Sequence, residues 1–452
     1  MSAHLRLREL NIRFNDQAPP VLSGVRLTVG SGECHCIVGP TGSGKSSLLL
    51  AAAGLLPPDA LGGDIERPAR PGAVFQNPGT QILFDHVGPE TAFALENAGV
   101  PPDAMPARVA RALAEADLPV PTHTLTASLS MGRQYRLVLA GALVAEPGLL
   151  LLDEPCAQLD PDGCRAVAGV IDATLRRGGG VLLCEHRPEP LAERITHWWR
   201  IEDGALRPSG PPSSGPPPSP AAPRRSAARP TDPGVPPLLD IRDLRLRRGA
   251  NQVFSGLDLA IRPGEAVHVE GGNGSGKSSL TRIMAGFLPP DSGRLSLFGE
   301  PVTPARLRGR VGLVLQSPSG QLFEDTVLDE LAFAARRKGL SDHEGRSRRV
   351  AEGLGIDALL DRPPFLLSYG QQRLTALGAC LTQEPDLLIL DDPFAGLDRD
   401  ARERVHGLLD RERAERGMAV LVTGHNPTSS LRFENFYTRE LRIGGGRLES
   451  VA

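Results

Sequence analysis

The sequence predicts an α/β fold that occurs twice in one chain, and three observations support this. GPTGSGKSSL at Gly39–Leu48 returns as GGNGSGKSSL at Gly271–Leu280. LLLLDEP at Leu149–Pro155 returns as LLILDDP at Leu387–Pro393, and four consecutive apolar residues are typical of a buried strand in a parallel sheet. An apolar run precedes each glycine-rich loop and a helix-like segment follows it. A repeat of this length indicates a duplicated domain, not a solenoid.

Composition restricts the class of protein further. The 452 residues are 40% hydrophobic and 23% charged, which is ordinary for globular domains. The net charge of -3 gives no chain-wide basic surface for nucleic acid. No apolar run approaches the roughly 18–20 residues that a membrane span needs, and MSAHLRLREL lacks the apolar region of a secretory signal. We expect a globular protein without a membrane span.

The cysteines and lysines are unusual in their placement. Six cysteines form no CxxC pair, which is typical of a reduced cytosolic protein. Cys34-His35-Cys36 could ligate a metal, but its apolar, strand-like surroundings favour a core position. The chain has 47 arginines and three lysines, namely Lys45, Lys277 and Lys338. We expect each lysine to stand where arginine cannot replace it.

The two copies differ in one segment and are separated by another. The second copy holds SGRLSLFGEPV at Ser292–Val302, which the first reduces to GGDIERPARPG at Gly62–Gly72, so a trimmed antiparallel edge is expected in the first half. Between the copies, residues 207–237 contain 12 prolines and are predicted to be an extended linker. The expected domains are therefore 1–206 and 238–452.

Each glycine-rich loop fits the P-loop pattern GxxxxGK[ST]. In this pattern backbone N–H groups surround a phosphate chain, the lysine meets the β- and γ-phosphates, and the serine hydroxyl binds Mg²⁺. The alternative is a glycine-rich turn without a ligand. The expected ATP-binding residues are Gly39, Gly42, Gly44, Lys45, Ser46 and Ser47 in the first copy and Gly271, Gly274, Gly276, Lys277, Ser278 and Ser279 in the second.

Two acidic residues end each LLLLDEP-like strand. Asp153 and Asp391 are placed to join Ser46 and Ser278 around Mg²⁺. The next residues, Glu154 and Asp392, can polarise an attacking water as general bases. Without a preceding P-loop, the alternative would be a helix N-cap or a solvated turn. The pattern predicts ATP and Mg²⁺ as cofactors.

Further segments carry a resemblance to a known family. LSMGR at Leu129–Arg133 and LSYGQ at Leu367–Gln371 resemble the LSGGQ signature of ATP-binding-cassette (ABC) ATPases. The resemblance covers both halves and implies two tandem P-loop domains, each with a mainly parallel sheet, an antiparallel β part and a helical insert. It implies that the domains pair head to tail within the chain, with each ATP between the P-loop of one domain and the signature of the other.

The resemblance assigns roles to further residues. It implies that the signature residues contact the nucleotide and that a glutamine in each domain, the Q-loop residue, contacts Mg²⁺. It also implies a D-loop at Ala157–Asp160 and at Ala395–Asp398, and one switch histidine in each domain. By this resemblance an aromatic residue stacks on adenine, for which the second copy offers Arg247 and Arg248 instead. The residues assigned in this way are Ser130, Gly132, Ser368, Gly370 and Gln371 for the signatures, Gln76 and Gln316 for the Q-loops, His186 and His425 as switches, and Phe14 for adenine.

A narrower resemblance follows each Q-loop. QNPGTQILF at Gln76–Phe84 and QSPSGQLF at Gln316–Phe323 look like a stretch of energy-coupling factor (ECF) transporter ATPases. This implies an ATP-hydrolysing motor of an importer for a vitamin or a transition-metal ion. The implied partners are an integral-membrane scaffold and a substrate-binding membrane subunit, with the chain peripheral at the cytoplasmic face of the membrane and no nucleic acid bound.

Two alternatives remain beside this reading. One is an ATPase of another ABC transporter class. The other is a soluble tandem ABC protein that acts on ribosomes or nucleic acid, although such relatives usually join their domains by a charged helical linker.

The two predicted sites are not equivalent. Met131 and Arg133 depart from the signature pattern in the first copy, and Tyr369 departs in the second. Asp392 is one methylene shorter than Glu154. With head-to-tail pairing, we expect the site on Lys45 to be the better one and the site on Lys277 to be degenerate.

Overall fold

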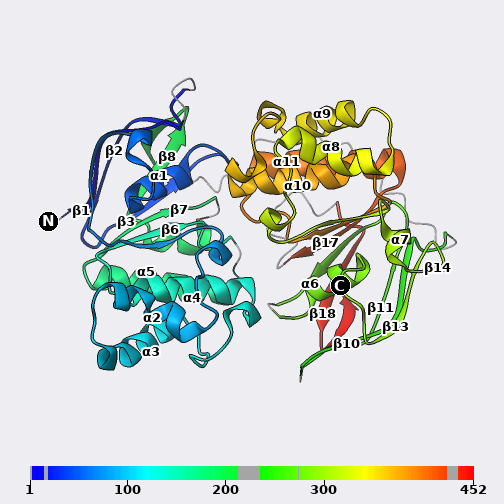
Figure 1. Ribbon diagram of the computed structural model, residues 1–452, viewed down its shortest axis with the longest axis horizontal. Coiled ribbons are helices and arrows are strands. Elements are labelled where there is room, and N and C mark those ends of the chain that lie inside the picture. Colours follow the sequence, from blue (N-terminus) through cyan, green and yellow to red (C-terminus); the bar gives the residue numbers. More distant parts are fainter. Residues whose placement is uncertain are drawn as a thin grey trace. The chain divides into compact units, whose positions relative to one another are not determined.

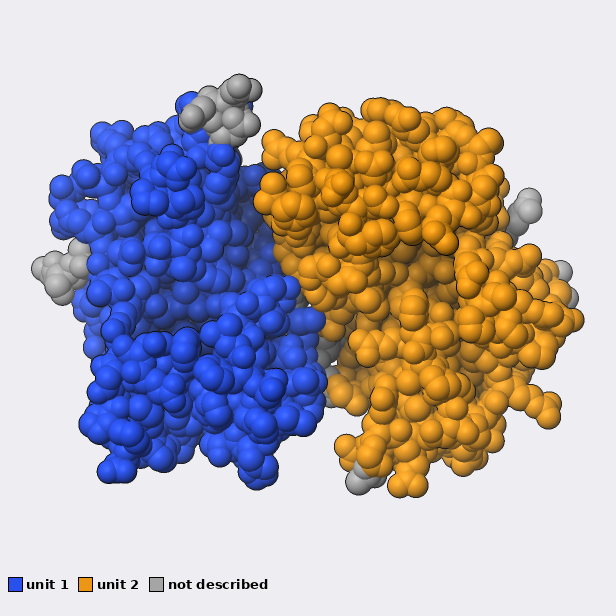
Figure 2. Space-filling model, viewed as in Figure 1, with its two compact units in different colours: residues 1–215 blue, residues 216–452 orange. Residues whose placement is uncertain are grey.

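The computed structural model describes residues 3–14, 19–157, 159, 161–186, 188–211, 235–249, 251–272, 274–424 and 436–451. The chain divides into two compact units, residues 1–215 and 216–452, which Figure 2 colours separately. Most of the expected linker, residues 212–234, lies outside the described residues, as does the predicted switch residue His425.

A six-stranded sheet forms the centre of unit 1, in the order β5-β6-β7-β3-β8-β9. Neighbouring strands from β5 to β8 pair in parallel, and β9 pairs antiparallel with β8. Every residue of β3, β6 and β7 is buried. This confirms the prediction that the strand from Leu149 is buried on both faces of a parallel sheet. The strands are β3 (Cys34–Val38), β5 (Gly72–Val74), β6 (Leu149–Asp153), β7 (Gly180–Cys184), β8 (His197–Glu202) and β9 (Ala205–Ser209).

An antiparallel sheet and a helical layer complete unit 1. The sheet has the order β2-β1-β4, with β1 (Ala3–Ile12), β2 (Leu22–Gly30) and β4 (Leu61–Glu66). The helices are α1 (Lys45–Ala53), α2 (Val87–Asn97), α3 (Met105–Glu115), α4 (Met131–Leu143) and α5 (Pro161–Arg176). In Figure 1, α2 and α3 lie beside α4, and residues of all three helices share one apolar cluster. This is the helical insert that the family resemblance implied.

Unit 2 repeats the plan of unit 1. Its parallel-rich sheet has the order β15-β16-β17-β12-β18-β19, and its antiparallel sheet the order β11-β10-β13-β14. The strands are β10 (Leu239–Arg248), β11 (Asn251–Ile261), β12 (Ala266–Glu270), β13 (Ser292–Leu297), β14 (Glu300–Pro301), β15 (Val311–Val314), β16 (Leu387–Asp391), β17 (Ala419–Gly424), β18 (Arg439–Gly444) and β19 (Arg447–Ser450). The helices are α6 (Lys277–Met284), α7 (Pro304–Leu307), α8 (Val327–Lys338), α9 (His343–Leu354), α10 (Tyr369–Thr382) and α11 (Arg399–Arg416).

The expected trimming of the first half is confirmed. β13 and β14 form a hairpin at the edge of the antiparallel sheet in unit 2, whereas the sheet in unit 1 ends at β4. The short helix α7 also follows this hairpin in unit 2. The extra residues of the second copy therefore extend the sheet edge and leave the parallel core unchanged.

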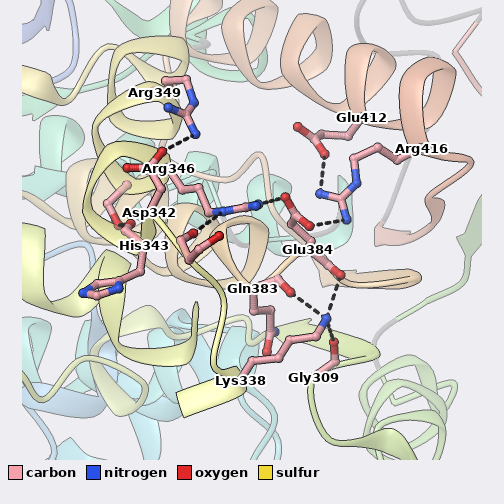
Figure 3. Close-up of polar contacts among 12 residues, drawn as sticks. Gly309, Lys338, Asp342, His343, Arg346, Arg349, Gln383, Glu384, Glu412 and Arg416 are labelled. Carbon is pink, nitrogen blue, oxygen red and sulfur yellow. Dashed lines mark hydrogen bonds and ion pairs between the residues drawn. The ribbon is translucent and has the colours of Figure 1, made fainter. Parts of the chain in front are cut away.

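The third lysine, Lys338, serves the packing of unit 2 (Figure 3). Its ammonium nitrogen donates to three backbone carbonyls, at 2.7 Å to Gly309, 2.8 Å to Gln383 and 3.1 Å to Glu384. Glu384 also forms ion pairs with Arg346 and Arg416, from α9 and α11. A single ammonium nitrogen can direct three N–H groups at carbonyls that converge on it, whereas each terminal nitrogen of a guanidinium has only two N–H groups, both in one plane. Lys338 thereby fastens the end of α8 to the turns before β15 and β16.

Candidate functional site

The first P-loop connects β3 to α1. Lys45, which is 5% exposed, donates to the carbonyl oxygens of Gly39 and Pro40, both at 2.9 Å. Gly44 has a φ of 99°, and a Cβ there would lie 2.9 Å from Val21 Cγ1, so a larger residue does not fit. The loop therefore curls around the lysine amine at the positive end of α1, an arrangement suited to a phosphate chain.

The second P-loop, between β12 and α6, has the same geometry. Lys277 Nζ donates to the carbonyl oxygens of Gly271 at 2.6 Å and Gly272 at 3.0 Å. Gly276 has a φ of 106°, and a Cβ there would lie 2.7 Å from Val253 Cγ1. Ser278 and Ser279 open α6 as Ser46 and Ser47 open α1; Gly42 and Gly274 also have positive φ.

Two serines that the sequence analysis did not single out belong to these loops. Within the described part of the chain, the hydroxyl oxygens of Ser43 and Ser275 are buried and have no hydrogen-bond partner. A buried hydroxyl without a partner is costly, so a ligand that accepts a hydrogen bond would stabilise both loops. The signal in the sequence was the repetition of serine directly before Gly-Lys in both copies.

Asp153 ends β6 beside the first P-loop. It is 2% exposed, and its side chain accepts a hydrogen bond from Ser46. Burial, followed by the negative charge of Glu154, raises the pKa of Asp153 to about 7, although Ser46 and Lys45 act in the opposite direction. Its Oδ1 has no hydrogen-bond partner among the described residues. An oxygen ligand that is buried and unsatisfied fits a hard cation such as Mg²⁺.

Gln76 and His186, two predicted site residues from distant segments, both contact the carboxylate of Glu154. Gln76 Nε2 donates to Glu154 Oε2 at 2.7 Å, and His186 Nε2 lies 3.1 Å from Glu154 Oε1. The side chains of Glu154 and His186 are 7% and 8% exposed. Glu154 also has a φ of 50°, a conformation that costs energy in a residue with a side chain. The structure thus holds one carboxylate in place with a Q-loop residue on one side and a histidine on the other.

The equivalent acids of unit 2 have different neighbours. Asp391 Oδ1 accepts a 2.6 Å hydrogen bond from the Thr423 hydroxyl, where unit 1 has Cys184. Asp392 also has a positive φ, 51°, and its backbone carbonyl accepts a 2.6 Å hydrogen bond from Arg373. Asp391 therefore already has a hydroxyl partner that Asp153 Oδ1 lacks.

Arg373 was missed by the sequence analysis. It is 1% exposed, and its Nη2 donates to the Gln316 carbonyl oxygen at 2.5 Å and to the Tyr369 hydroxyl at 3.0 Å. Tyr369 in turn donates to the same carbonyl oxygen at 2.8 Å. Arg373 Nη1 also donates to the backbone carbonyl oxygen of Asp392. Arg373 therefore links the signature helix α10 to Gln316 and to the turn that follows β16. A tyrosine and an arginine four residues apart on α10 were the available signal.

Both signature segments lie at helix N-termini. Ser130 precedes α4, and Ser368 precedes α10 in a capping box with Gln371. The box has bonds of 3.4 Å from the Gln371 amide to the Ser368 hydroxyl and 3.0 Å from the Ser368 amide to Gln371 Oε1. Gly132 and Gly370 are buried one position inside each helix, and Arg133 is exposed. A helix N-terminus favours an anionic ligand, but these segments lie in different units from their expected P-loops.

Phe14, the predicted adenine contact, is 58% exposed and follows β1. Arg247 and Arg248, which stand in its place in unit 2, are also exposed at the end of β10.

The segments after Gln76 and Gln316 share a second glutamine that fixes the loop. Gln81 accepts from the Phe75 amide at 2.8 Å and donates to the Ala73 carbonyl at 3.3 Å. Gln321 accepts from the Leu315 amide at 2.7 Å and donates to the Leu313 carbonyl at 2.7 Å. Each second glutamine therefore closes its loop onto the strand before the Q-loop.

A glutamate organises the next turn in both units. Glu90 accepts from the amides of Leu83 and Phe84, and Glu330 from those of Phe323 and Glu324. Leu83 is left 67% exposed and Phe323 63% exposed. Both units thus present an exposed apolar side chain on a hydrogen-bonded turn that follows the Q-loop glutamine.

The Cys34-His35-Cys36 segment lies in the core of unit 1 as predicted. Cys34 and Cys36 are fully buried in one apolar cluster. His35 points to the other side of the strand, where its Nε2 lies 3.0 Å from Glu33 and its ring stacks on His197. Trp199 Nε1 donates to His35 Nδ1 at 3.1 Å, so the proton of the neutral ring is on Nε2 and is donated to Glu33. Burial lowers the pKa of His35, in agreement with a neutral ring.

The comparisons with known proteins identify the family. Residues 22–157 and 254–395 match the family described as ABC transporter, once in each unit. These regions cover more than half of the chain, which therefore belongs to the ABC transporter family as a tandem ATP-binding protein. Its enzymatic class is that of an ATPase coupled to transport.

Similar proteins carry related names. "Putative ABC transporter ATP-binding protein BL0043" of Bifidobacterium longum is 33% identical over 93% of this chain, which spans only 63% of that protein. "Putative HMP/thiamine import ATP-binding protein YkoD" of Bacillus subtilis is 28% identical over 93% of this chain and 87% of that protein. The solved structure of cbiO1 from Clostridium perfringens, described as part of the ABC transporter complex cbiONQ, covers 47% of this chain and 87% of that one, with 29% identity and a TM-score of 0.42.

Among the described residues, no helix combines the length and the apolar character that a membrane crossing requires.

Proposed function

We propose that this chain is the ATP-hydrolysing subunit of an ECF-type importer for a vitamin or a transition-metal ion. The loop after each Q-loop glutamine carries this proposal. Its second glutamine and its glutamate make the same hydrogen bonds in both units, so the Gln-x-Pro-x-x-Gln pattern corresponds to a built structure. The name of the Bacillus subtilis relative, which refers to HMP/thiamine import, is in agreement.

The catalytic part of the proposal concerns the site on Lys45. There Lys45 and the amides of the loop from Gly39 would hold the phosphates. Glu154 would orient the attacking water and accept its proton, because its carboxylate is buried and fixed by Gln76 and His186. Since both contacts leave the carboxylate no freedom to rotate, little reorganisation is needed when the reaction begins.

The residues around Asp153 fit a magnesium ion. Ser46 and Asp153 are hydrogen-bonded to each other, and the second Asp153 oxygen is buried without a partner. We assign Mg²⁺ binding to these two side chains and to Gln76, and to Ser278, Asp391 and Gln316 in unit 2. Bound there with ATP, Mg²⁺ would neutralise charge that develops on the phosphates.

Two unequal sites follow from the same geometry. The shorter Asp392 replaces Glu154, and Asp391 has a hydroxyl partner in Thr423. If the domains 1–206 and 238–452 pair head to tail, the first signature completes the Lys277 site. In that signature Met131 and Arg133 replace the residues that the family pattern has. The intact signature residues Ser368, Gly370 and Gln371 then complete the Lys45 site. We assign most of the hydrolysis to the Lys45 site and mainly ATP binding to the Lys277 site.

The proposed partners are an integral-membrane scaffold and a substrate-binding membrane subunit, with this chain on the cytoplasmic face of the membrane. Leu83 and Phe323, exposed on hydrogen-bonded turns, would contact cytoplasmic segments of the scaffold. Both turns are joined to the catalytic glutamines through only a few residues, so movement of a bound segment can reach Glu154 through Gln76.

Photo-crosslinking in the native cell tests this assignment. A photoreactive amino acid is placed at Leu83 or at Phe323, and at Phe287, which is 75% exposed on another part of unit 2, as the matched control. We expect positions 83 and 323 to crosslink to one multi-span membrane protein and position 287 not to do so. Crosslinks from positions 83 and 323 to ribosomal proteins, or equal capture from all three positions, would contradict the importer assignment.

A further inference from the structure

Two cysteines of unit 1 flank the segment that follows Glu154. Cys156 stands two positions after Glu154, and Cys164 stands in the first turn of α5. The Cys164 Sγ lies 3.9 Å from the Cys156 carbonyl oxygen, eight positions away, and the two thiols are hydrogen-bonded to each other. Both residues are half-buried and pack at the edge of the apolar core of unit 1. Two thiols in contact are the geometry from which a disulfide forms.

The surroundings make the two thiols unequal in reactivity. The Cys164 thiol stands in the first turn of the 16-residue helix α5 and donates to the carbonyl oxygens of Cys156 at 3.9 Å and Leu159 at 4.0 Å. The hydrogen bond with Cys164, followed by burial, raises the pKa of Cys156. We assign the first attack on an oxidant to Cys164, at the positive end of α5, and the second step to Cys156.

Cys156 is connected to the catalytic carboxylate through its backbone. Its amide donates to Glu185 Oε1 at 2.8 Å, and Glu185 Oε2 accepts from the His186 amide at 3.1 Å. His186 contacts Glu154, which is itself only two residues before Cys156. A displacement of Cys156 toward α5 therefore acts on Glu154 from two directions.

Unit 2 lacks this pair. Counted from Asp391 as from Asp153, the corresponding positions hold Phe394 and Arg402. Phe394 stacks on His406 with ring centroids 4.7 Å apart. The thiol pair is therefore a property of the unit that holds Lys45 and Glu154.

We propose that Cys156 and Cys164 are a reversible modification site, at which a disulfide slows ATP turnover at the Lys45 site. With a peroxide as oxidant, the Cys164 thiolate attacks one oxygen, the O–O bond breaks, and the departing oxygen leaves as water after taking a proton. The Cys156 sulfur then attacks the sulfenic acid on Cys164, the S–O bond breaks, and a second water leaves with the thiol proton. In sum, two thiols and one hydrogen peroxide give one disulfide and two waters.

The disulfide acts through geometry. An S–S bond is about 2.05 Å long, shorter than any hydrogen bond between thiols, so its formation draws Cys156 toward α5. A dithiol reductant reverses the step, as is usual for the rare disulfides of intracellular proteins.

Peptide mapping of the full chain tests the modification itself. Both cysteines fall on one tryptic peptide, residues 137–165, because no lysine or arginine lies between them. After brief exposure to hydrogen peroxide and blocking of free thiols with iodoacetamide, we expect this peptide without alkylation and lighter by two hydrogens. The rate of phosphate release should fall by about tenfold to a hundredfold, since a misplacement of about 1 Å in a catalytic site can cost on the order of a hundredfold, and it should return with dithiothreitol.

Cysteine variants separate this site from general oxidation. Cys164→Ser and, independently, Cys156→Ser should abolish both the linked peptide and the loss of rate. Cys380→Ser, which removes a half-buried thiol of unit 2, should retain both effects. Absence of the linked peptide in the wild-type chain, or equal peroxide sensitivity in either of the first two variants, overturns the proposal. These readouts require only ATPase activity, so they do not depend on the importer assignment.

Discussion

The raised pKa of Asp153 predicts that unit 1 loses stability as the pH rises from about 4 to about 7, when nucleotide and divalent cations are absent. The folded pKa of about 7 exceeds the ordinary value of 3.8. In this window the folded chain retains a proton on Asp153 that the unfolded chain has released. The free energy of unfolding therefore falls as the pH rises and is constant, for this group, above about pH 8. A difference of about three pH units corresponds to on the order of 4 kcal/mol.

Tryptophan fluorescence can follow unit 1 alone. The chain has two tryptophans, Trp198 and Trp199, and both belong to β8 of unit 1. We would measure urea unfolding in EDTA at several values between pH 5 and pH 8 for the wild type and for Asp153→Asn, which keeps the shape and removes the charge. The difference between the two isolates Asp153 from other groups that titrate.

The wild type should lose stability with rising pH relative to Asp153→Asn. Glu154→Gln should lessen the slope, because the charge of Glu154 is the second cause of the raised pKa. Addition of Mg²⁺ with ATP should stabilise the wild type most at high pH, where Asp153 is ionised. Parallel pH profiles for the wild type and Asp153→Asn would refute the reasoning.

Three other substitutions have definite expected outcomes. Lys45→Ala should lower phosphate release by about a hundredfold or more, because the amine that we propose to bind the phosphates is lost. Half the wild-type rate would contradict the proposed role of the first P-loop. Gln81→Ala removes the hydrogen bonds to Phe75 and Ala73 and should lower the free energy of unfolding of unit 1 by about 1–3 kcal/mol. Urea unfolding followed by tryptophan fluorescence measures this change, and an unchanged midpoint would contradict it. Lys338→Met leaves three carbonyls without their donor and should lower the free energy of unfolding of unit 2 by about 1–3 kcal/mol, measured by calorimetry. Lys338→Arg should recover only part of this loss, and full recovery would show that the positive charge alone matters.

Local patterns in the sequence were sufficient to predict the parallel cores. A glycine-rich loop between an apolar run and a helix former admits few structures, and in both units the loop lies between a core strand and a helix and curls around its lysine, Lys45 or Lys277. The length difference between the copies also predicted the missing hairpin correctly, because insertions are tolerated at sheet edges. The proximity of Gln76, Glu154 and His186 agrees with the family resemblance, although it does not test their roles.

Other features depended on contacts between distant segments. Lys338 meets carbonyls from two turns that are 29 and 45 residues away, and no periodicity encodes such a meeting. Little in the sequence distinguishes Arg373 from the other arginines of predicted helices. In the structure its guanidinium connects the signature helix α10 to the backbone carbonyls of Gln316 and Asp392. The Thr423 hydroxyl on Asp391 likewise depends on which strand lies beside β16. Packing decides these contacts, and a single sequence does not display it.

The proposed inequality of the two sites is tested most directly by comparing Glu154→Gln with Asp392→Asn. Each variant replaces one carboxylate by its amide and keeps the shape, and phosphate release is measured with the membrane partners present. Loss of a positioned base costs on the order of 10²–10⁴ in rate. We predict a loss of this size for Glu154→Gln and a change of less than about fivefold for Asp392→Asn. Equal losses would show two equivalent sites, and a larger loss in Asp392→Asn would reverse the assignment.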